Sequence, residues 1–238
     1  MEIIEIYQDK DVLVFEKPSG IPVLKEGNIK ISFADIIVKK YDFLKEVERS
    51  GIVHRLDKDT SGVLLVGKSN KSLLFLQKQF KNRDVKKRYL ALVWGNVKGE
   101  KGIIDAPLGR SLSDFRKQKA YPLSLPGKGI KREAVTKYRV IEKFKEYSFL
   151  EVEPETGRKH QIRCHLSYLG YPVAGDNLYG FKNQKNPSNL KRIFLHACYI
   201  KINLPSGVLK EFHSDLPEEL KEVLENLKKD NKKHDYQN

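Results

Sequence analysis

A dense block of ionisable residues lies between two apolar runs and reads His54-Arg55-Leu56-Asp57-Lys58-Asp59-Thr60-Ser61-Gly62. Ile52-Val53 precedes it and Val63-Leu64-Leu65-Val66 follows, so we expect buried strands to hold the block on a loop. Loops on a rigid scaffold often carry catalytic side chains, because these are both oriented and accessible. Asp57 is a carboxylate that can act as nucleophile or base, and Arg55 adds a cation two residues earlier. A solvated surface hairpin is the alternative that the residue types leave open.

The scaffold around this loop is predicted from hydrophobic periodicity. Apolar runs predict strands at residues 3–7, 12–15, 89–93, 134–141, 147–152, 194–204 and 208–212. Apolar residues at helical spacing predict helices after Ser32, after Ser69, over residues 160–169 and from Pro217. Because strands and helices mix without a regular β-α-β alternation, we predict an α+β fold. It would be a single catalytic domain over residues 1–227, with a mainly antiparallel mixed β-sheet flanked by helices and loops. Residues 228–238 are polar and expected to form a disordered tail.

The composition favours a phosphate-bearing partner. The formal net charge is +14 and the sequence pI is near 9.5, as in proteins that bind nucleic acid. A generally basic protein without such a partner would show the same numbers. No Gly-rich phosphate-binding loop is present, so the sequence offers no support for a nucleotide cofactor.

The cysteines and the chain start bear on the compartment. Cys164 and Cys198 form no C-x-x-C pair, so we expect buried, reduced thiols rather than a zinc site or a disulfide framework. The start lacks the basic and apolar regions of a signal peptide, and no run approaches the roughly 20 apolar residues of a membrane span. We therefore expect a cytoplasmic protein, without membrane contact, and a monomer.

Four blocks of the chain resemble, in order, the RluA family of RNA pseudouridine synthases. The block at His54 resembles the family signature HRLD-x-x-TSG, and Glu16-Lys17-Pro18-Ser19-Gly20-Ile21-Pro22 its K-P-x-G segment. Lys87-Arg88-Tyr89-Leu90-Ala91-Leu92-Val93 resembles the K-x-Y-x-A pattern. The fourth block is Thr156-Gly157-Arg158-Lys159-His160-Gln161-Ile162-Arg163-Cys164-His165-Leu166 with residues 170–176. Leu195-His196-Ala197 resembles a late L-H-A element, whereas residues 111–131 and those beyond Phe212 lie outside the resemblance.

The resemblance implies an isomerase that converts uridine in RNA to pseudouridine. The base is cut from its sugar at nitrogen 1, turned, and rejoined through carbon 5, without cofactor or metal. Asp57 would be the catalytic carboxylate, Arg163 its charged partner, and Tyr89 the ring that stacks on the displaced base. Arg55 would enter the RNA stack where the flipped uridine has left a gap.

Further RNA contacts are predicted from two sources. The matching motifs add His54, Arg158 and His160. Residues 110–132 are rich in Lys and Arg, hold the single acidic residue Asp114, and interleave aromatic residues that could stack on bases. From this composition we predict that RNA is bound by Arg110, Arg116, Lys117 and Lys119. A solvated loop is the alternative for this segment.

The expected partner is ribosomal or transfer RNA. Some relatives carry a small RNA-binding domain before the catalytic one, but here the K-P-x-G segment begins at Lys17 and leaves too few residues for it. We therefore expect the catalytic surface itself to select the RNA.

Two other function classes are weighed against this one. In a metal-dependent hydrolase the ligands would be His54, Asp57, His160 and His165, but the last two are spaced i, i+5 and fall on different helix faces. A chelator would abolish such an activity. The other class is an RNA-binding module or chaperone without catalysis, which nucleoside chromatography of treated RNA would distinguish from an isomerase.

Overall fold

The computed structural model of the chain describes residues 3–25, 27, 29–123 and 131–235. Its contacts divide the chain into two compact units. Unit 1 comprises Met1–Lys87 with His196–Asp215, and unit 2 comprises Arg88–Leu195 with Leu216–Asn238. The predicted α+β class with a mainly antiparallel sheet is confirmed. Inside each unit, the described strands pair antiparallel except for β3 with β11.

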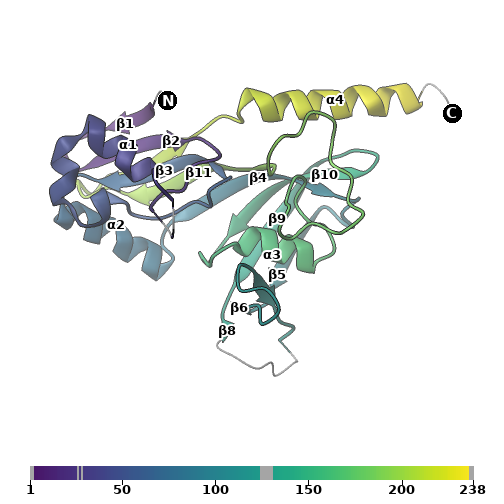
Figure 1. Ribbon diagram of the computed structural model, residues 1–238, viewed down its shortest axis with the longest axis horizontal. Coiled ribbons are helices and arrows are strands. Elements are labelled where there is room, and N and C mark those ends of the chain that lie inside the picture. Colours follow the sequence, from purple (N-terminus) through teal and green to yellow (C-terminus); the bar gives the residue numbers. More distant parts are fainter. Residues whose placement is uncertain (1–2, 26, 28, 124–130, 236–238) are drawn as a thin grey trace. The chain divides into compact units, whose positions relative to one another are not determined.

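Unit 1 is a sheet with two helices beside it (Figure 1). Its strands are β1 (Ile4–Gln8), β2 (Val12–Lys17), β3 (Ser61–Gly67), β11 (Leu195–Asn203) and β12 (Leu209–His213). β2 lies between β1 and β3, and β11 pairs with both β3 and β12, the latter as the predicted hairpin. All residues of β3 are buried. Because successive strand residues point to opposite faces, both faces of β3 are covered.

The helices of unit 1 begin where the sequence predicts. They are α1 (Phe33–Lys40) and α2 (Asn70–Asn82), and the 3-10 segments η1 (Asp42–Glu46) and η2 (Glu48–Gly51) lie between α1 and β3. The Ser32 hydroxyl accepts from the Asp35 N–H at 3.3 Å, and the Asp35 carboxylate accepts from the Ser32 N–H at 2.7 Å. The Ser69 hydroxyl likewise accepts from the Ser72 N–H at 3.1 Å. Both serines therefore satisfy backbone donors that a helix start leaves unpaired.

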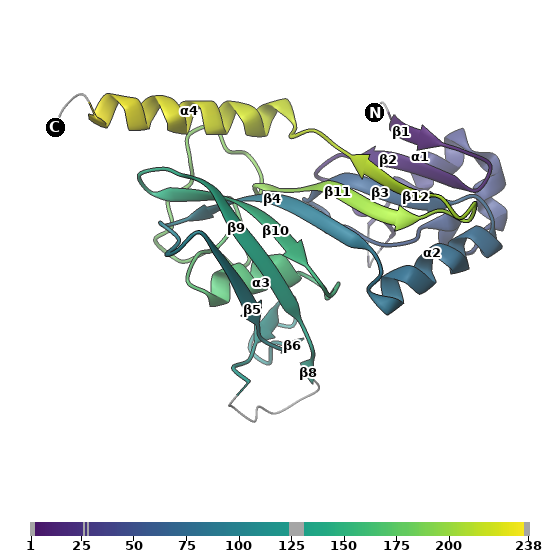
Figure 2. The ribbon, with the colours of Figure 1, turned by 180° about the vertical axis from the view of Figure 1, so that it is seen from behind.

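The main part of unit 2 is an antiparallel sheet with a helix on each face (Figure 2). The strand order is β4 (Lys86–Trp94), β10 (Tyr147–Pro154), β9 (Val135–Lys143) and β5 (Lys101–Asp105). Strand alternation separates two cores. Ala91 packs with Leu166 of α3 (Gln161–Tyr168), whereas Leu92 packs with Leu220 and Leu224 of α4 (Glu218–Asp235). No helix of the described ranges has the length and apolar character that a bilayer span requires.

The basic segment 110–132 is partly strand rather than wholly a loop. β6 (Leu108–Arg110), β7 (Gln118–Ala120) and β8 (Lys131–Arg132) form a small sheet in the order β7-β6-β8. These strands have only three, three and two residues, too few to show a periodic hydrophobic pattern, so the sequence does not predict them. Residues 124–130, with the basic Lys128, lie outside the described residues.

Helix α4 extends through Asp235, although we expected a disordered tail from residue 228. Asn231 explains the added turns. Its Oδ1 accepts from the Lys145 N–H at 3.0 Å, and its Nδ2 donates to the Lys143 carbonyl at 3.5 Å. Lys228 also lies 3.7 Å from a Glu142 carboxylate oxygen. These partners are distant in sequence, so local composition could not predict them.

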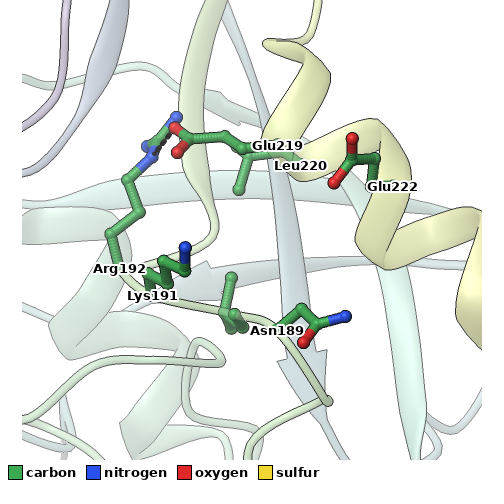
Figure 3. A pocket seen from close by; sticks show the side chains of 7 residues that line it. Asn189, Lys191, Arg192, Glu219, Leu220 and Glu222 are labelled. Atoms are coloured by element: carbon green, nitrogen blue, oxygen red, sulfur yellow. Dashed lines mark hydrogen bonds and ion pairs between the residues drawn. The ribbon is translucent and has the colours of Figure 1, made fainter.

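The start of α4 is joined to the loop before β11. Arg192 Nε lies 2.6 Å from Glu219 Oε1, and the Arg192 side chain is largely buried. A pocket beside this ion pair is shown in Figure 3, lined by Asn189, Leu190, Lys191, Arg192, Glu219, Leu220 and Glu222. None of the predicted site residues is among them. The pocket therefore belongs to the contact between this loop and the start of α4.

Candidate active site

The loop that carries Asp57 is held by a buried lysine of unit 1. Lys17 ends β2 and is fully buried. Its ammonium donates to main-chain carbonyls at 2.6 Å (Pro18), 2.8 Å (Ile21) and 3.1 Å (Lys58). Three carbonyl dipoles thus offset the cost of removing this cation from water. The last of them belongs to the residue after Asp57, so Lys17 fixes the backbone of the loop.

The rest of the K-P-x-G segment grips the same loop. The Gly20 N–H donates to the Lys58 carbonyl at 3.0 Å, and the Ser19 hydroxyl donates to the Asp59 carbonyl at 2.7 Å. Within the loop, the Thr60 N–H donates to the Asp57 carbonyl at 3.1 Å and closes a turn. The side chain of Asp57 is left half-buried and that of Arg55 exposed. The segment therefore orients the loop while these two side chains stay accessible.

His54 supports the loop from beneath. Its ring stacks on Phe80 with centroids 4.7 Å apart, and its Nε2 accepts from the Leu65 N–H at 3.2 Å. Burial, and then the charge of Lys87, lower the pKa of His54 to about 3. The imidazole is therefore neutral at physiological pH and ties the loop to β3. These contacts give His54 a supporting role in the loop, and its contact with RNA stays a prediction.

The end of the loop is fixed by a close approach of β3 to β11. Gly62 has φ +121°, and a Cβ added there would lie 2.1 Å from the Ala197 carbonyl oxygen. Beside this pair, Ser61 Oγ lies 2.9 Å from His196 Nδ1, and His196 Nε2 donates to the Ser214 carbonyl at 3.0 Å. The contacts explain why a glycine ends the T-S-G string and why a histidine and a small residue stand in L-H-A.

The close approach at Gly62 predicts a large loss of stability in Gly62→Ala. We expect the free energy of unfolding to fall by more than about 3 kcal/mol, because both backbone strain and overpacking oppose the methyl group. Gly207→Ala is the matched control, since Gly207 also has a positive φ but no atom within 4 Å of an added Cβ. It should cost only about 1 to 2 kcal/mol. Urea unfolding of both variants checks this, and equal losses would contradict the packing argument.

In unit 2 the predicted cation Arg163 is fixed by a buried carboxylate. Arg163 lies on α3, and its Nε and Nη2 donate to Asp176 at 2.7 and 2.9 Å. The Asp176 side chain is fully buried, while 14% of the Arg163 side chain is exposed. Burial alone would raise the pKa of Asp176, but the Arg163 guanidinium and the N–H groups of Tyr179 and Leu178 outweigh it and lower that pKa. The pair therefore stays ionised, and Arg163 keeps one orientation.

Tyr179 links Arg163 to the small basic sheet. Its ring centroid lies 5.2 Å from the Arg163 guanidinium carbon. Its hydroxyl accepts from the Gln118 N–H at 2.7 Å and lies 3.1 Å from His160 Nδ1. His160 is thus engaged with Tyr179 at the start of α3, and its RNA contact stays a prediction.

The remaining polar residues of the fourth motif hold α3 against β9. Gln161 Nε2 donates to Thr136 Oγ1 at 3.0 Å, and its Oε1 accepts from the Thr156 hydroxyl at 2.7 Å. His165 is fully buried, with its two ring nitrogens 2.8 Å from Thr136 Oγ1 and 2.9 Å from the Ala106 carbonyl. Both nitrogens are therefore occupied, which argues against His165 as a metal ligand. Arg158 donates to the Glu133 carbonyl at 3.0 Å.

The basic sheet presents cations beside aromatic rings. The Arg110 guanidinium lies 5.4 Å from the Phe115 ring centroid, and the Lys119 ammonium lies 5.6 Å from that of Tyr121. Arg116 is 79% exposed at its side chain and pairs with Asp114, with Nη2 and Oδ2 2.8 Å apart. Phe115 is itself exposed. This is the mixture of charges and stacking surfaces that single-stranded RNA binds.

The predicted catalytic residues lie in different units. Asp57, with Arg55 and His54, belongs to unit 1, whereas Tyr89 and Arg163 belong to unit 2. Tyr89 is half-buried on β4 and packs against the core on the α3 side. The pairing of Asp57 with Arg163 therefore stays a prediction.

Sequence reasoning missed the residues that position the others. No role is predicted for Asp176, which ends the fourth block, or for Tyr179, which stands three residues later. A lone Asp in a turn-like string gives no sign of a buried ion pair. Cys164 is buried as expected, whereas Cys198 is half-buried.

Comparisons with known proteins agree on one family. The family model described as RNA pseudouridylate synthase matches residues 11–168. "Uncharacterized RNA pseudouridine synthase YlyB" of Bacillus subtilis is 36% identical over 234 residues, which cover 96% of this chain and 74% of that protein. "Ribosomal large subunit pseudouridine synthase D" of Borreliella burgdorferi is 38% identical over 232 residues, which cover 94% of this chain and 68% of that protein. The solved structure of "Human RNA Pseudouridylate Synthase Domain Containing 4" superposes with a TM-score of 0.76 at 25% identity. The superposition covers 94% of this chain and 93% of that one.

Proposed function

The chain belongs to the RNA pseudouridine synthase family and is an isomerase, and from this premise we propose that Asp57 is its catalytic carboxylate and ribosomal RNA its substrate. The support for Asp57 is the construction of its loop. A buried lysine, a serine and a glycine of one motif bind the backbone on the C-terminal side of Asp57, yet the carboxylate stays accessible. Such fixation of a reactive group is what a positioned nucleophile or base requires.

Isomerisation of uridine needs no external reagent. The bond between nitrogen 1 and the sugar breaks, and a bond between carbon 5 and the sugar forms. Carbon 5 loses a proton and nitrogen 1 gains one, so atoms and electrons balance without an oxidant or a reductant. Asp57 serves this sequence either by attacking the sugar or the base, or by taking a proton from the sugar.

The other predicted residues act on the RNA around this step. Tyr89 stacks on the displaced base, and its hydroxyl helps to remove the carbon 5 proton. Arg55 is exposed beside Asp57 and fills the gap in the RNA stack after the uridine flips out. Arg163, held by Asp176, stabilises the charge of Asp57.

Ribosomal RNA is favoured over transfer RNA by the names of the relatives. Those called ribosomal large subunit pseudouridine synthase D or C align with most of this chain. Incubation of the purified protein with transcripts of large-subunit ribosomal RNA and of transfer RNA, followed by nucleoside chromatography, tests the choice. We expect pseudouridine in the ribosomal transcript. Modification of transfer RNA alone would refute the substrate, and no pseudouridine in either would favour an RNA-binding role without catalysis.

The small basic sheet is expected to bind the RNA backbone. Replacing Arg116, Lys117 and Lys119 by Ala should weaken binding to all RNA sequences alike, because phosphate contacts carry no sequence information. Each lost contact should flatten the slope of log affinity against log salt by roughly 0.7 to 0.9. Turnover at saturating RNA should change little. Titrations over a range of potassium chloride measure the slope. An unchanged slope would mean that these residues are solvated surface groups that do not contact RNA.

A further inference from the structure

Lys87 is a half-buried lysine beside the support of the Asp57 loop. Its ammonium nitrogen lies 6.0 Å from the centroid of the Phe80 ring, which is the ring that stacks on His54. With the residues that the structure describes, this ammonium makes no hydrogen bond and no ion pair. Lys17, which is fully buried in the same unit, has three carbonyl acceptors. The two lysines therefore differ in kind, and the charge of Lys87 lacks compensation.

The position of Lys87 in β4 relates it to the reacting residues. Side chains two apart in a strand share a face, so Lys87 points to the same side of β4 as Tyr89 and opposite to Lys86. Its charge also reaches His54, whose pKa it lowers together with burial. His54 stands three residues before Asp57. Lys87 thus lies close to His54, at the start of the Asp57 loop.

A cation in this setting is destabilised until an anion reaches it. Burial lowers the pKa of Lys87 to about 8, because the charged form loses hydration that no acceptor within the described ranges replaces. An anion beside the ammonium would reverse that effect. In an enzyme that acts on RNA, every nucleotide brings one negative phosphate, and lysine binds phosphate as a compact point charge.

We propose that Lys87 binds a backbone phosphate next to the target uridine and so positions that nucleotide against the Asp57 loop. The inference rests on the proposed role of Asp57, and Lys87 is a positioning residue, since it touches the substrate backbone and not the bond that breaks. The competing explanation is that the Lys87 stem only packs on Phe80 and keeps its ammonium in water.

Kinetics of Lys87→Met, which keeps the stem and removes the charge, test the inference. We expect KM for a stem-loop RNA to rise about tenfold or more, the range for a lost charged hydrogen bond, with kcat within a few-fold. The salt slope of log affinity should flatten by roughly 0.7 to 0.9, for one phosphate. Lys86→Met makes the same change on the opposite face of β4 and should leave KM within about twofold. Thermal unfolding of both variants reports whether they fold.

Neutral linkages in the RNA identify the contact itself. Methylphosphonates are placed one at a time around the target uridine, and binding is measured for the starting protein, Lys87→Met and Lys87→Arg. We expect one linkage whose neutral form weakens the starting protein and Lys87→Arg, but does not weaken Lys87→Met further. If Lys87→Met loses affinity at every linkage in parallel with the starting protein, the inference is overturned. A fall in kcat at constant KM would overturn it too, and neither outcome affects the role of Asp57, which Asp57→Asn tests separately.

Discussion

Asp57→Asn is expected to form no detectable pseudouridine while it still binds RNA within several-fold of the starting protein. The substitution keeps the shape of the side chain and removes the negative charge that attacks the sugar or the base, or accepts a proton. Nothing else in the loop need move, because Lys17, Gly20 and Ser19 hold its backbone through main-chain carbonyls. Nucleoside chromatography of digested RNA measures the product, and a filter-binding titration measures the affinity.

Asp59→Asn is the matched control for this experiment. Asp59 lies on the same loop, is exposed, and undergoes the same change of carboxylate to amide. We expect it to retain most of the activity, since its backbone carbonyl still accepts from Ser19. Appreciable turnover by purified Asp57→Asn, or equal losses of activity in both variants, would show that Asp57 is not the catalytic carboxylate.

Arg163→Met is expected to lose both activity and stability. It leaves the fully buried Asp176 carboxylate without its cation, and breaking a buried pair in this way costs about 3 to 5 kcal/mol. Activity should fall too, because the cation assigned to Asp57 is gone. Urea unfolding and single-turnover assays measure the two effects.

A double variant separates the two roles of Arg163. Adding Asp176→Leu to Arg163→Met removes the stranded charge, so much of the lost stability should return, because apolar replacement of both partners is often neutral. Activity should not return with it. If the double variant regains activity as well as stability, Arg163 acts only through the fold.

The pH dependence of stability gives an independent check on the same pair. The pKa of Asp176 is lower in the folded protein than in the unfolded chain. Its ion pair therefore stabilises the fold above the unfolded pKa of about 3.9, and this contribution is lost as the pH falls through the folded value. In Arg163→Met, burial acts on Asp176 without the opposing guanidinium, so the pKa of this carboxyl rises and it takes up a proton at a higher pH. The stability difference between the starting protein and Arg163→Met should accordingly be largest at high pH, shrink as the pH falls through the raised pKa of the variant, and shrink further as Asp176 of the starting protein is protonated.

The sequence predicts those parts of the molecule whose signals are local. The caps at Ser32 and Ser69, the hairpin of β11 with β12, and the α+β class follow from spacing and residue type, and the structure confirms them. The family follows from long ordered strings such as the one at His54. Residues 228–235 escaped this reasoning, because the partners of Asn231 come from a distant hairpin.

The supporting residues of the site could not be predicted for the same physical reason. The neighbours Pro18 and Gly20 predict a surface turn at Lys17, but its ammonium is buried against carbonyls that include one from a remote loop. Asp176 is visible in the sequence only as one acidic residue, and its meaning depends on Arg163 one helix earlier. Reactive residues can be recognised by type, whereas the groups that hold them are defined by long-range contacts.

Pseudouridine mapping across ribosomal RNA tests the central claim most directly. The RNA is taken from cells that lack this protein, from the same cells supplied with it, and from cells supplied with Asp57→Asn at an equal level. We predict one or more ribosomal uridines that are modified only in the cells with the unaltered protein. Identical maps in all three, or restoration by Asp57→Asn, would contradict the account.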